Sequence, residues 1–309
     1  MPRPHSHSSS HRGSCVAAER SAGGALIEVR GLGYRYPRAQ RAALAGLTFD
    51  VRAGEVFGFL GPSGAGKSTT QNILTGLLGG YDGAVRVFGD AIEAHGRDYY
   101  DRIGVAFEVP NLHLSLTGRE NLEFFASLHR VPTAPPVTLL ALLGLADAAD
   151  DRAGTYSRGM RMRLNFCRSL LTSPELLFLD EPTTGQDPEN ARRIKQVVRE
   201  RQAAGATVFL TTHDMAVAAE LCDRVAFLVD GRIAVVDAPR TLMVRHGQRR
   251  VRVEFRSAGA LDVREFDLDA IARDDAFCTL VRQGTVESIH SLDATLEDVF
   301  LAVTGRGLR

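Results

Sequence analysis

A glycine-rich segment near the start of the chain constrains its fold more than any other feature. It has the form G-x-x-x-x-G-K-[ST], in which glycines let the backbone amides close around a chain of phosphate groups. Lys67 supplies a positive charge for β- and γ-phosphates, and the Ser68 hydroxyl is placed to ligate Mg²⁺. The segment consists of Gly61, Pro62, Ser63, Gly64, Ala65, Gly66, Lys67, Ser68 and Thr69.

The flanking residues favour a phosphate-binding loop over a chance match. Residues 56–60 (VFGFL) predict a buried strand, and residues 68–78 carry apolar side chains at helical spacing. A strand, a loop and a helix in this order aim the helix N-terminus at the phosphates. The segment therefore predicts a nucleoside triphosphate site, and alone it does not distinguish a kinase, a GTPase or an ATPase.

The composition narrows the class of protein. The chain has 309 residues and is 44% hydrophobic, which predicts one large domain with a smaller one, or two domains. Lys plus Arg and Asp plus Glu number 37 each, and this balance disfavours general binding to nucleic acid. The longest apolar run, residues 137–149, is too short to cross a bilayer.

The N-terminal segment and the cysteines predict no site. Residues 1–24 are rich in Ser, His, Arg and Gly without an apolar signal core, so we expect a disordered tail. The four cysteines lack the spacing of disulfide pairs or metal ligands and predict reduced thiols. They are Cys15, Cys167, Cys222 and Cys278.

The remaining pattern predicts an α/β domain over residues 25–241, followed by a smaller unit. A helical subdomain is expected at about 99–158, where Thr117 and Glu120 form a capping box and prolines separate two helices. Residues 175–181 and 207–213 predict buried strands of a parallel sheet, and Asp230-Gly231 predicts a hairpin. Residues 245–309 predict an α+β appendage with a helix at about 268–283 and a last helix at 295–303.

Two carboxylates and a histidine follow the predicted buried strands. Asp180 ends one strand, where it can hold Mg²⁺, and Glu181 can deprotonate a water that attacks a γ-phosphate. The alternative for Asp180 and Glu181 is an acidic surface pair without catalytic function, and the alternative for a histidine at a strand end is a structural role. Because His213 ends the next strand, and the carboxyl ends of parallel strands share one edge of a sheet, we expect all three beside the phosphate loop.

The order of these motifs resembles that of the ATP-binding subunits of ABC transporters over residues 25–239. The motifs are GPSGAGKST, YSRGM at 156–160, LLFLDEP at 176–182, GQDP at 185–188 and TTHD at 211–214. LTGRENL at 116–122 and ATLEDVFLAVTG at 294–305 resemble the drug- and lipid-export subfamily, including the type named for fluoroquinolone export. The resemblance implies a P-loop ABC ATPase core of the α/β class with a helical subdomain and a small C-terminal appendage.

The resemblance also implies a role for the motif residues. Tyr36 is implied to stack on adenine, the phosphate loop to hold ATP, and Ser68 and Asp180 to ligate Mg²⁺. Glu181 is implied to be the general base and His213 to contact the γ-phosphate.

Further implied roles involve other chains. Ser157 and Gly159 are implied to act on the nucleotide of a second copy of the chain, and Asp187 to link the two sites. The resemblance thus implies a homodimer that serves a separate transmembrane permease from the cytoplasmic face of the membrane.

Two positions depart from the family pattern. Glu108 stands where a glutamine is usual, in the loop that senses Mg²⁺ and touches the membrane subunit. A carboxylate there is able to ligate Mg²⁺ and take part in catalysis, but it places negative charge near the γ-phosphate, so we expect hydrolysis or coupling to differ. Gln186 replaces the usual leucine before Asp187, and we expect only a modest packing effect.

The predicted function is that of an ATP-hydrolysing motor subunit of an exporter for drugs or other hydrophobic compounds. A soluble ABC ATPase acting on DNA or the ribosome is the alternative, disfavoured by the balanced charge and by the lack of a paired ATPase domain. A non-hydrolysing regulatory subunit is disfavoured because Lys67, Asp180, Glu181 and His213 are all present. The transported compound is not predicted, because its contacts belong to the membrane subunit.

Overall fold

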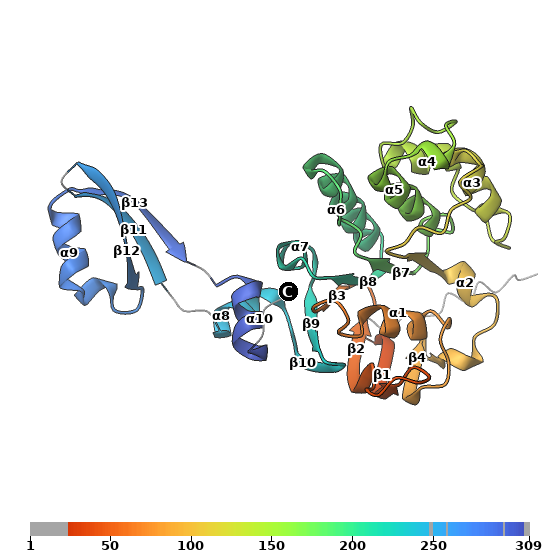
Figure 1. Cartoon of the computed structure of the whole chain (residues 1–309), viewed down its shortest axis with the longest axis horizontal. Helices are drawn as coiled ribbons and strands as arrows, with labels where there is room; N and C mark the ends of the chain where they lie inside the picture. The colour runs from red at the N-terminus through yellow and green to blue at the C-terminus, as the bar shows by residue number, and fades with distance from the viewer. Residues whose placement is uncertain (1–23, 247–249, 258, 293, 306–309) are drawn as a thin grey trace, which may run out of the picture.

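A six-stranded sheet forms the centre of the main domain in the computed structural model, which describes residues 24–246, 250–257, 259–292 and 294–305 (Figure 1). All neighbouring strands in it are parallel except β10, which pairs antiparallel with β9. Strands β3, β7 and β8 are buried along their whole length, as expected for parallel strands covered on both faces. The order is β10 (Arg232–Asp237), β9 (Arg224–Val229), β3 (Val56–Leu60), β8 (Thr207–Thr212), β7 (Leu176–Asp180) and β6 (Ile103–Ala106).

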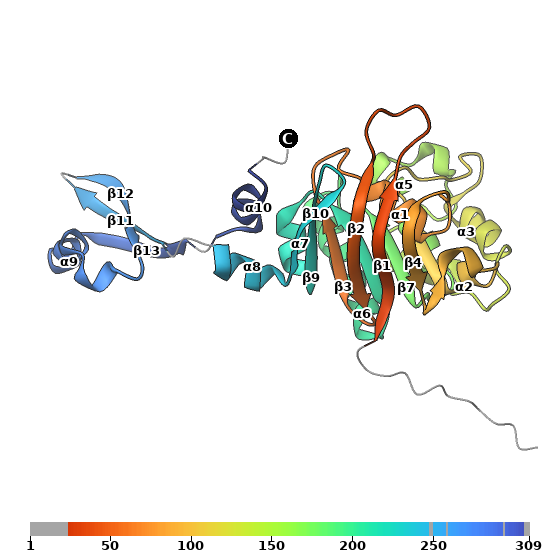
Figure 2. The same ribbon diagram turned by 90° about the horizontal axis from the view of Figure 1, so that it is seen from below.

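An antiparallel four-stranded sheet covers one face of this central sheet (Figure 2). Aromatic side chains fill the space between the sheets: the Phe49 ring lies 5.7 Å from that of Phe57 and 5.3 Å from that of Phe59. Such contacts add to the stabilisation from burial of apolar area. The strands, in spatial order, are β2 (Leu44–Arg52), β1 (Ala25–Tyr34), β4 (Asp82–Val87) and β5 (Asp90–Ala91).

Helices cover the opposite face and extend into a helical arm. A second core joins the central sheet to these helices, with Leu164, Val198 and Leu221 among its fully buried members. The predicted capping box at Thr117 and Glu120 is present at the start of α3. The helices are α3 (Gly118–Ala126), α4 (Pro136–Leu142), α5 (Arg158–Ser169), α6 (Pro188–Ala203) and α7 (Met215–Leu221).

The helical arm begins later than the sequence predicts. After the short helix α2 (Tyr99–Arg102), residues Ile103–Ala106 form the edge strand β6 beside β7. Gly104 allows the close approach of α5 to this strand, because an added Cβ would collide with the carbonyl oxygen of Ser169 on α5. The expectation of helix from residue 99 is therefore wrong for this segment: four apolar residues carry too little periodicity to reveal a strand.

The C-terminal appendage has its own small core. Strand β11 (Arg250–Ser257) lies between β12 (Ala260–Asp267) and β13 (Val286–Leu292), all antiparallel. The helix expected at 268–283 is divided into a 3₁₀ turn (Ile271–Arg273) and α9 (Asp275–Arg282). The buried members of this core are Val251, Val253, Phe255, Phe266 and Leu280. The tail predicted over residues 1–24 lies outside the described residues except for Gly24.

The last helix differs from the expectation that residues 245–309 form one unit. Helix α10 (Leu296–Thr304) packs into the core of the main domain through Leu296, Val299 and Phe300, beside α8 (Pro239–His246) (Figure 1). The Phe300 ring lies 5.2 Å from that of Phe227 on β9. The chain thus leaves the main domain after α8 and returns to it with α10, so the appendage comprises only the segment between them.

This packing predicts that Phe300 stabilises the main domain although it follows the appendage in sequence. Phe300 is fully buried, so Phe300→Ala should lower the free energy of unfolding by about 3–5 kcal/mol. Leu301→Ala is the matched control, because Leu301 is 43% exposed and its truncation should change stability by less than about 1 kcal/mol. Urea unfolding of both variants measures the difference, and equal effects would contradict the docking of α10.

Candidate active site

One cavity of about 360 Å³ gathers most of the residues that the sequence predicts for a nucleotide site. It lies beside the carboxyl ends of β7 and β8, where Asp180, Glu181 and His213 follow the strands. Of its lining residues, only Ala43 was not predicted. The lining comprises Tyr36, Ala43, Ser63, Gly64, Gly66, Lys67, Ser68, Thr69, Glu108, Asp180, Glu181 and His213.

The phosphate loop connects β3 to helix α1 (Lys67–Leu74) in a form that requires glycine. Gly66 has φ of 111° and precedes the first residue of the helix, a conformation that side chains with a Cβ rarely adopt. An added Cβ on Gly61 would collide with the carbonyl oxygen of Leu228 on β9. The loop therefore packs against the sheet on one side and presents the N-terminus of α1 on the other.

Lys67 is held inside the loop by the loop itself. Its Nζ donates to the carbonyl oxygens of Gly61, at 2.6 Å, and Pro62, at 3.1 Å. Burial lowers the pKa of Lys67, and the nearby carboxylates of Glu181 and Asp180 oppose that shift. The loop carbonyls thus position the ammonium group at the centre of the loop.

Ser68 and Asp180 bring two oxygen ligands together. The Ser68 hydroxyl donates to Oδ2 of Asp180 at 3.3 Å, and the Thr211 hydroxyl donates to Oδ1. Burial raises the pKa of Asp180, with the charge of Glu108 as a smaller contribution in the same direction. A hydroxyl and a carboxylate at this spacing form the hard oxygen set that Mg²⁺ prefers, so the residues present fit this ion.

Glu181 is fixed by contacts on both carboxylate oxygens. Its Oε1 lies 2.8 Å from Nδ1 of His213, and its Oε2 accepts from the hydroxyls of Thr184, at 3.0 Å, and Thr212, at 3.1 Å. The residue is buried and has φ of 50°. A left-handed conformation is strained for glutamate and persists only where surrounding contacts hold it, as at functional sites.

Two predicted residues lie at the rim of the cavity. The Tyr36 hydroxyl is 3.1 Å from that of Thr69, and the residue as a whole is 42% exposed. Glu108 is exposed in the loop after β6. That loop is tied to α5 by Asn165, whose Nδ2 donates to the Phe107 carbonyl at 2.8 Å.

Within the predicted phosphate loop, Gly61, Pro62 and Ala65 do not line this cavity. Three predicted residues outside the loop do not line it either. Ser157 caps α5 by accepting from the amide of Met160 at 3.2 Å. Gly159 lies in the first turn of the same helix, and Asp187 caps α6 by accepting from the amide of Asn190 at 3.0 Å. Their local positions are those of helix N-termini, which favour anionic groups.

The threonines that support the carboxylates were not predicted from the sequence. Thr211 and Thr212 end strand β8 after three apolar residues, and Thr184 follows Glu181 by three residues. Thr211 and Thr212 belong to the TTHD motif, and Thr184 directly precedes the GQDP motif. Hydroxyl side chains at the end of a buried strand were the available signal, because a buried hydroxyl needs a partner.

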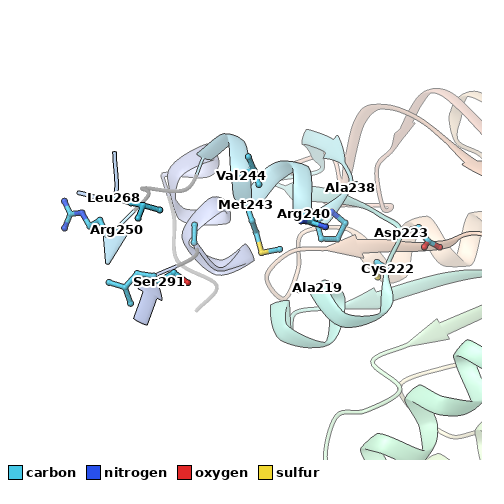
Figure 3. A pocket seen from close by; sticks show the side chains of 13 residues that line it. Ala219, Cys222, Asp223, Ala238, Arg240, Met243, Val244, Arg250, Leu268 and Ser291 are labelled. Carbon is cyan, nitrogen blue, oxygen red and sulfur yellow. The ribbon is translucent and has the colours of Figure 1, made fainter. Parts of the chain in front are cut away.

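A larger cavity of about 680 Å³ lies elsewhere, between α7, α8 and the appendage (Figure 3). Among the described residues that line it, Asp223 is the one carboxylate, and its Oδ2 accepts from the Val56 amide at 2.8 Å and from Gln202 at 2.6 Å. Burial raises the pKa of the Cys222 thiol on its wall. The described lining of this cavity does not contain the predicted motif residues, which gather at the smaller cavity.

Comparisons with known proteins agree with this geometry. The family model for ABC transporters matches residues 44–184, and the model for the fluoroquinolone efflux ABC transporter C-terminal domain matches residues 249–293. The chain is similar to the fluoroquinolones export ATP-binding protein of Mycobacterium tuberculosis, with 55% identity over 95% of this chain and 98% of the relative. The Nod factor export ATP-binding protein I of Burkholderia orbicola is 33% identical over 92% of this chain and 99% of the relative.

Solved structures give the same result. An ATP-binding subunit of an ABC transporter matches with a TM-score of 0.65 and 28% identity, over 72% of this chain and 93% of that one. A dimeric ATP-binding cassette in a post-hydrolysis state, bound to ADP and phosphate, matches with a TM-score of 0.63 and 25% identity. The match covers 69% of this chain and 98% of that one. The chain therefore belongs to the ABC transporter family, as an ATP-binding subunit that hydrolyses ATP.

Proposed function

We propose that this subunit works as a homodimer and drives the export of fluoroquinolones or other hydrophobic drugs through a separate membrane permease. The main support for ATP hydrolysis in this proposal is that Lys67, Asp180 and Glu181 line the same cavity. The names of the similar export proteins support the class of cargo. The balanced charge of the chain disfavours the alternative of an ATPase acting on DNA or the ribosome.

Each residue at the cavity has a proposed part in hydrolysis. Lys67 would exchange its bonds to the loop carbonyls for bonds to β- and γ-phosphate oxygens. Ser68 and Asp180 would hold Mg²⁺, with Glu108 as a further oxygen ligand, and the ion when bound would neutralise charge on the phosphates. Tyr36 would stack on the adenine at the rim.

Glu181 would orient and deprotonate the attacking water. Its carboxylate is already held by two threonine hydroxyls and by His213, so little reorganisation is needed before proton transfer. His213 is 52% exposed at its side chain and so is free to reach the γ-phosphate as well. This arrangement favours hydrolysis over simple nucleotide binding.

A second copy of the chain would complete the site. Ser157, Gly159 and Asp187 lie outside the cavity of their own chain, at helix N-termini suited to phosphate. The similarity to a dimeric ATP-binding cassette supports this assembly. We propose that the Ser157 turn of one chain closes over the ATP held by the phosphate loop of the other.

A groove of about 330 Å³ near Glu108 would receive the permease. Its lining combines the exposed Tyr100 and Leu128 with Arg168, whose Nη1 donates to the carbonyl of Asn111 in the Glu108 loop at 3.0 Å. No helix among the described residues is both long and apolar enough to cross a membrane. We therefore propose that the subunit acts from the cytoplasmic face, attached through this groove.

Replacing the proposed base tests the mechanism. Glu181→Gln should bind ATP and form a stable dimer but hydrolyse ATP at least about a hundredfold more slowly, because the amide cannot accept the proton. Steady-state phosphate release and size-exclusion chromatography with ATP measure both effects. Glu200→Gln, a change at an exposed position of α6, is the control. Full ATPase activity in Glu181→Gln would refute the assignment.

Replacing Glu108 tests the electrostatic effect of this unusual position. Glu108→Gln removes one negative charge near Asp180 and Lys67. We expect KM for MgATP to fall about threefold at low ionic strength, with the difference shrinking as salt is added, because exposed charges are screened. An unchanged KM at low salt would show that this charge does not reach the phosphates.

A crosslinking experiment tests the docking groove. Leu128→Cys introduces a thiol at a groove residue that is 48% exposed, and Val244→Cys places one on α8 at a residue that is 73% exposed. Both changes belong in a background in which Cys15 and Cys278 are serine. Only Leu128→Cys should crosslink to the permease in membranes. Equal crosslinking from both positions would argue against this groove.

A further inference from the structure

One side chain joins the loop after Glu181 to the first turn of α5. The Nε2 atom of Gln186 donates to the carbonyl oxygen of Gly159 at 3.2 Å. A Cβ on Gly159 would lie 3.3 Å from Oε1 of Gln186, so the amide group rests directly on the glycine. The position at which leucine is usual in the family therefore carries a specific polar contact, beyond the modest packing effect expected from the sequence.

The other end of the same loop holds the proposed base. The Thr184 hydroxyl donates to Oε2 of Glu181 at 3.0 Å, and the Thr184 amide donates to the Glu181 carbonyl at 3.1 Å. The Gln186 amide closes a second turn on the carbonyl of Thr183 at 3.2 Å. Two hydrogen-bonded turns thus span the six residues from Glu181 to Gln186, and the first of them also holds the Glu181 carboxylate.

A neighbouring network makes the two helices a firm support for this connection. Arg163 on α5 donates to Oδ1 of Asn190 on α6 at 2.6 Å, and Asn190 donates to Asp187 at 2.6 Å. These bonds join α5 to the first turn of α6, whereas Gln186 joins the residue just before α6 to the first turn of α5. Gln186 is half-buried and Gly159 is half-buried, so both can be altered without opening a core.

We infer that Gln186 is a positioning residue that makes the Ser157–Gly159 turn move together with the loop that holds Glu181. The inference rests on the proposed dimer, in which this turn serves the nucleotide of the partner chain while Glu181 serves the chain's own. One hydrogen bond then couples the closing of one site to the alignment of the base at the other. Leucine has a similar size but no donor, so it would keep the packing and lose the coupling.

The first experiment measures ATP-driven dimerisation of the full chain in the Glu181→Gln background. Adding Gln186→Leu should raise the ATP concentration at half-dimerisation about fivefold, the effect of losing one neutral hydrogen bond. Gln196→Leu is the matched control, because Gln196 is exposed on α6 and bonds only to Glu200 among the contacts described. ATP binding to the monomer should be unchanged in all three, since the phosphate loop is intact.

The second experiment measures steady-state hydrolysis in the otherwise unaltered chain. Gln186→Leu should lower kcat about fivefold and bring the Hill coefficient for ATP toward one, and Gln186→Glu should lower kcat further because its carboxylate faces the Gly159 carbonyl. A role in packing alone would leave the Hill coefficient of Gln186→Leu at its original value. That result, or equal effects of Gln186→Leu and Gln196→Leu, would overturn the inference.

The two proposals fail in different ways. If Glu181→Gln does not dimerise with ATP, the proposed function fails and this inference falls with it. If Glu181→Gln dimerises and the added Gln186→Leu change has no effect, only the inference fails.

Discussion

The burial of two adjacent carboxylates at the end of an apolar strand is the constraint on which the site depends. Asp180 and Glu181 are both buried, and burying charge is costly unless hydrogen bonds compensate. The compensation comes from β8, through Thr211 and Thr212, and from the phosphate loop, through Ser68. Strands β7 and β8 and the loop after β3 therefore have to meet at one edge, and the parallel order of the sheet brings them there.

The local parts of this site could be predicted because each is formed by residues that are consecutive in the sequence. The phosphate loop, the strand that ends at Asp180 and the cap at Ser157 need only short-range spacing to be recognised. The threonine contacts depend instead on register, since Asp180 pairs with Thr211 across the sheet. No single segment carries that pairing, so the hydroxyl partners of the carboxylates were not predicted.

The same distinction between local and long-range contacts explains why strand β6 and the docking of α10 were not predicted. Strand β6 has four residues, and its identity depends on its neighbour β7 and on the close approach of α5 at Gly104. Helix α10 was predicted as a helix, but its partner could not be, because an apolar helix face fits any apolar surface of similar shape. Its contact with Phe227 is a property of the assembled domain rather than of its own sequence.

The return of α10 has a consequence for how the appendage relates to the motor. Because α8 and α10 pack against each other and α10 packs against α7 and β10, both chain connections to the appendage start from one anchored helix pair. The anchored pair contacts the central sheet at β10, which pairs with β9, and β9 is the strand whose Leu228 carbonyl lies against Gly61 of the phosphate loop. The point at which the appendage is attached and the phosphate loop therefore contact the same pair of neighbouring strands.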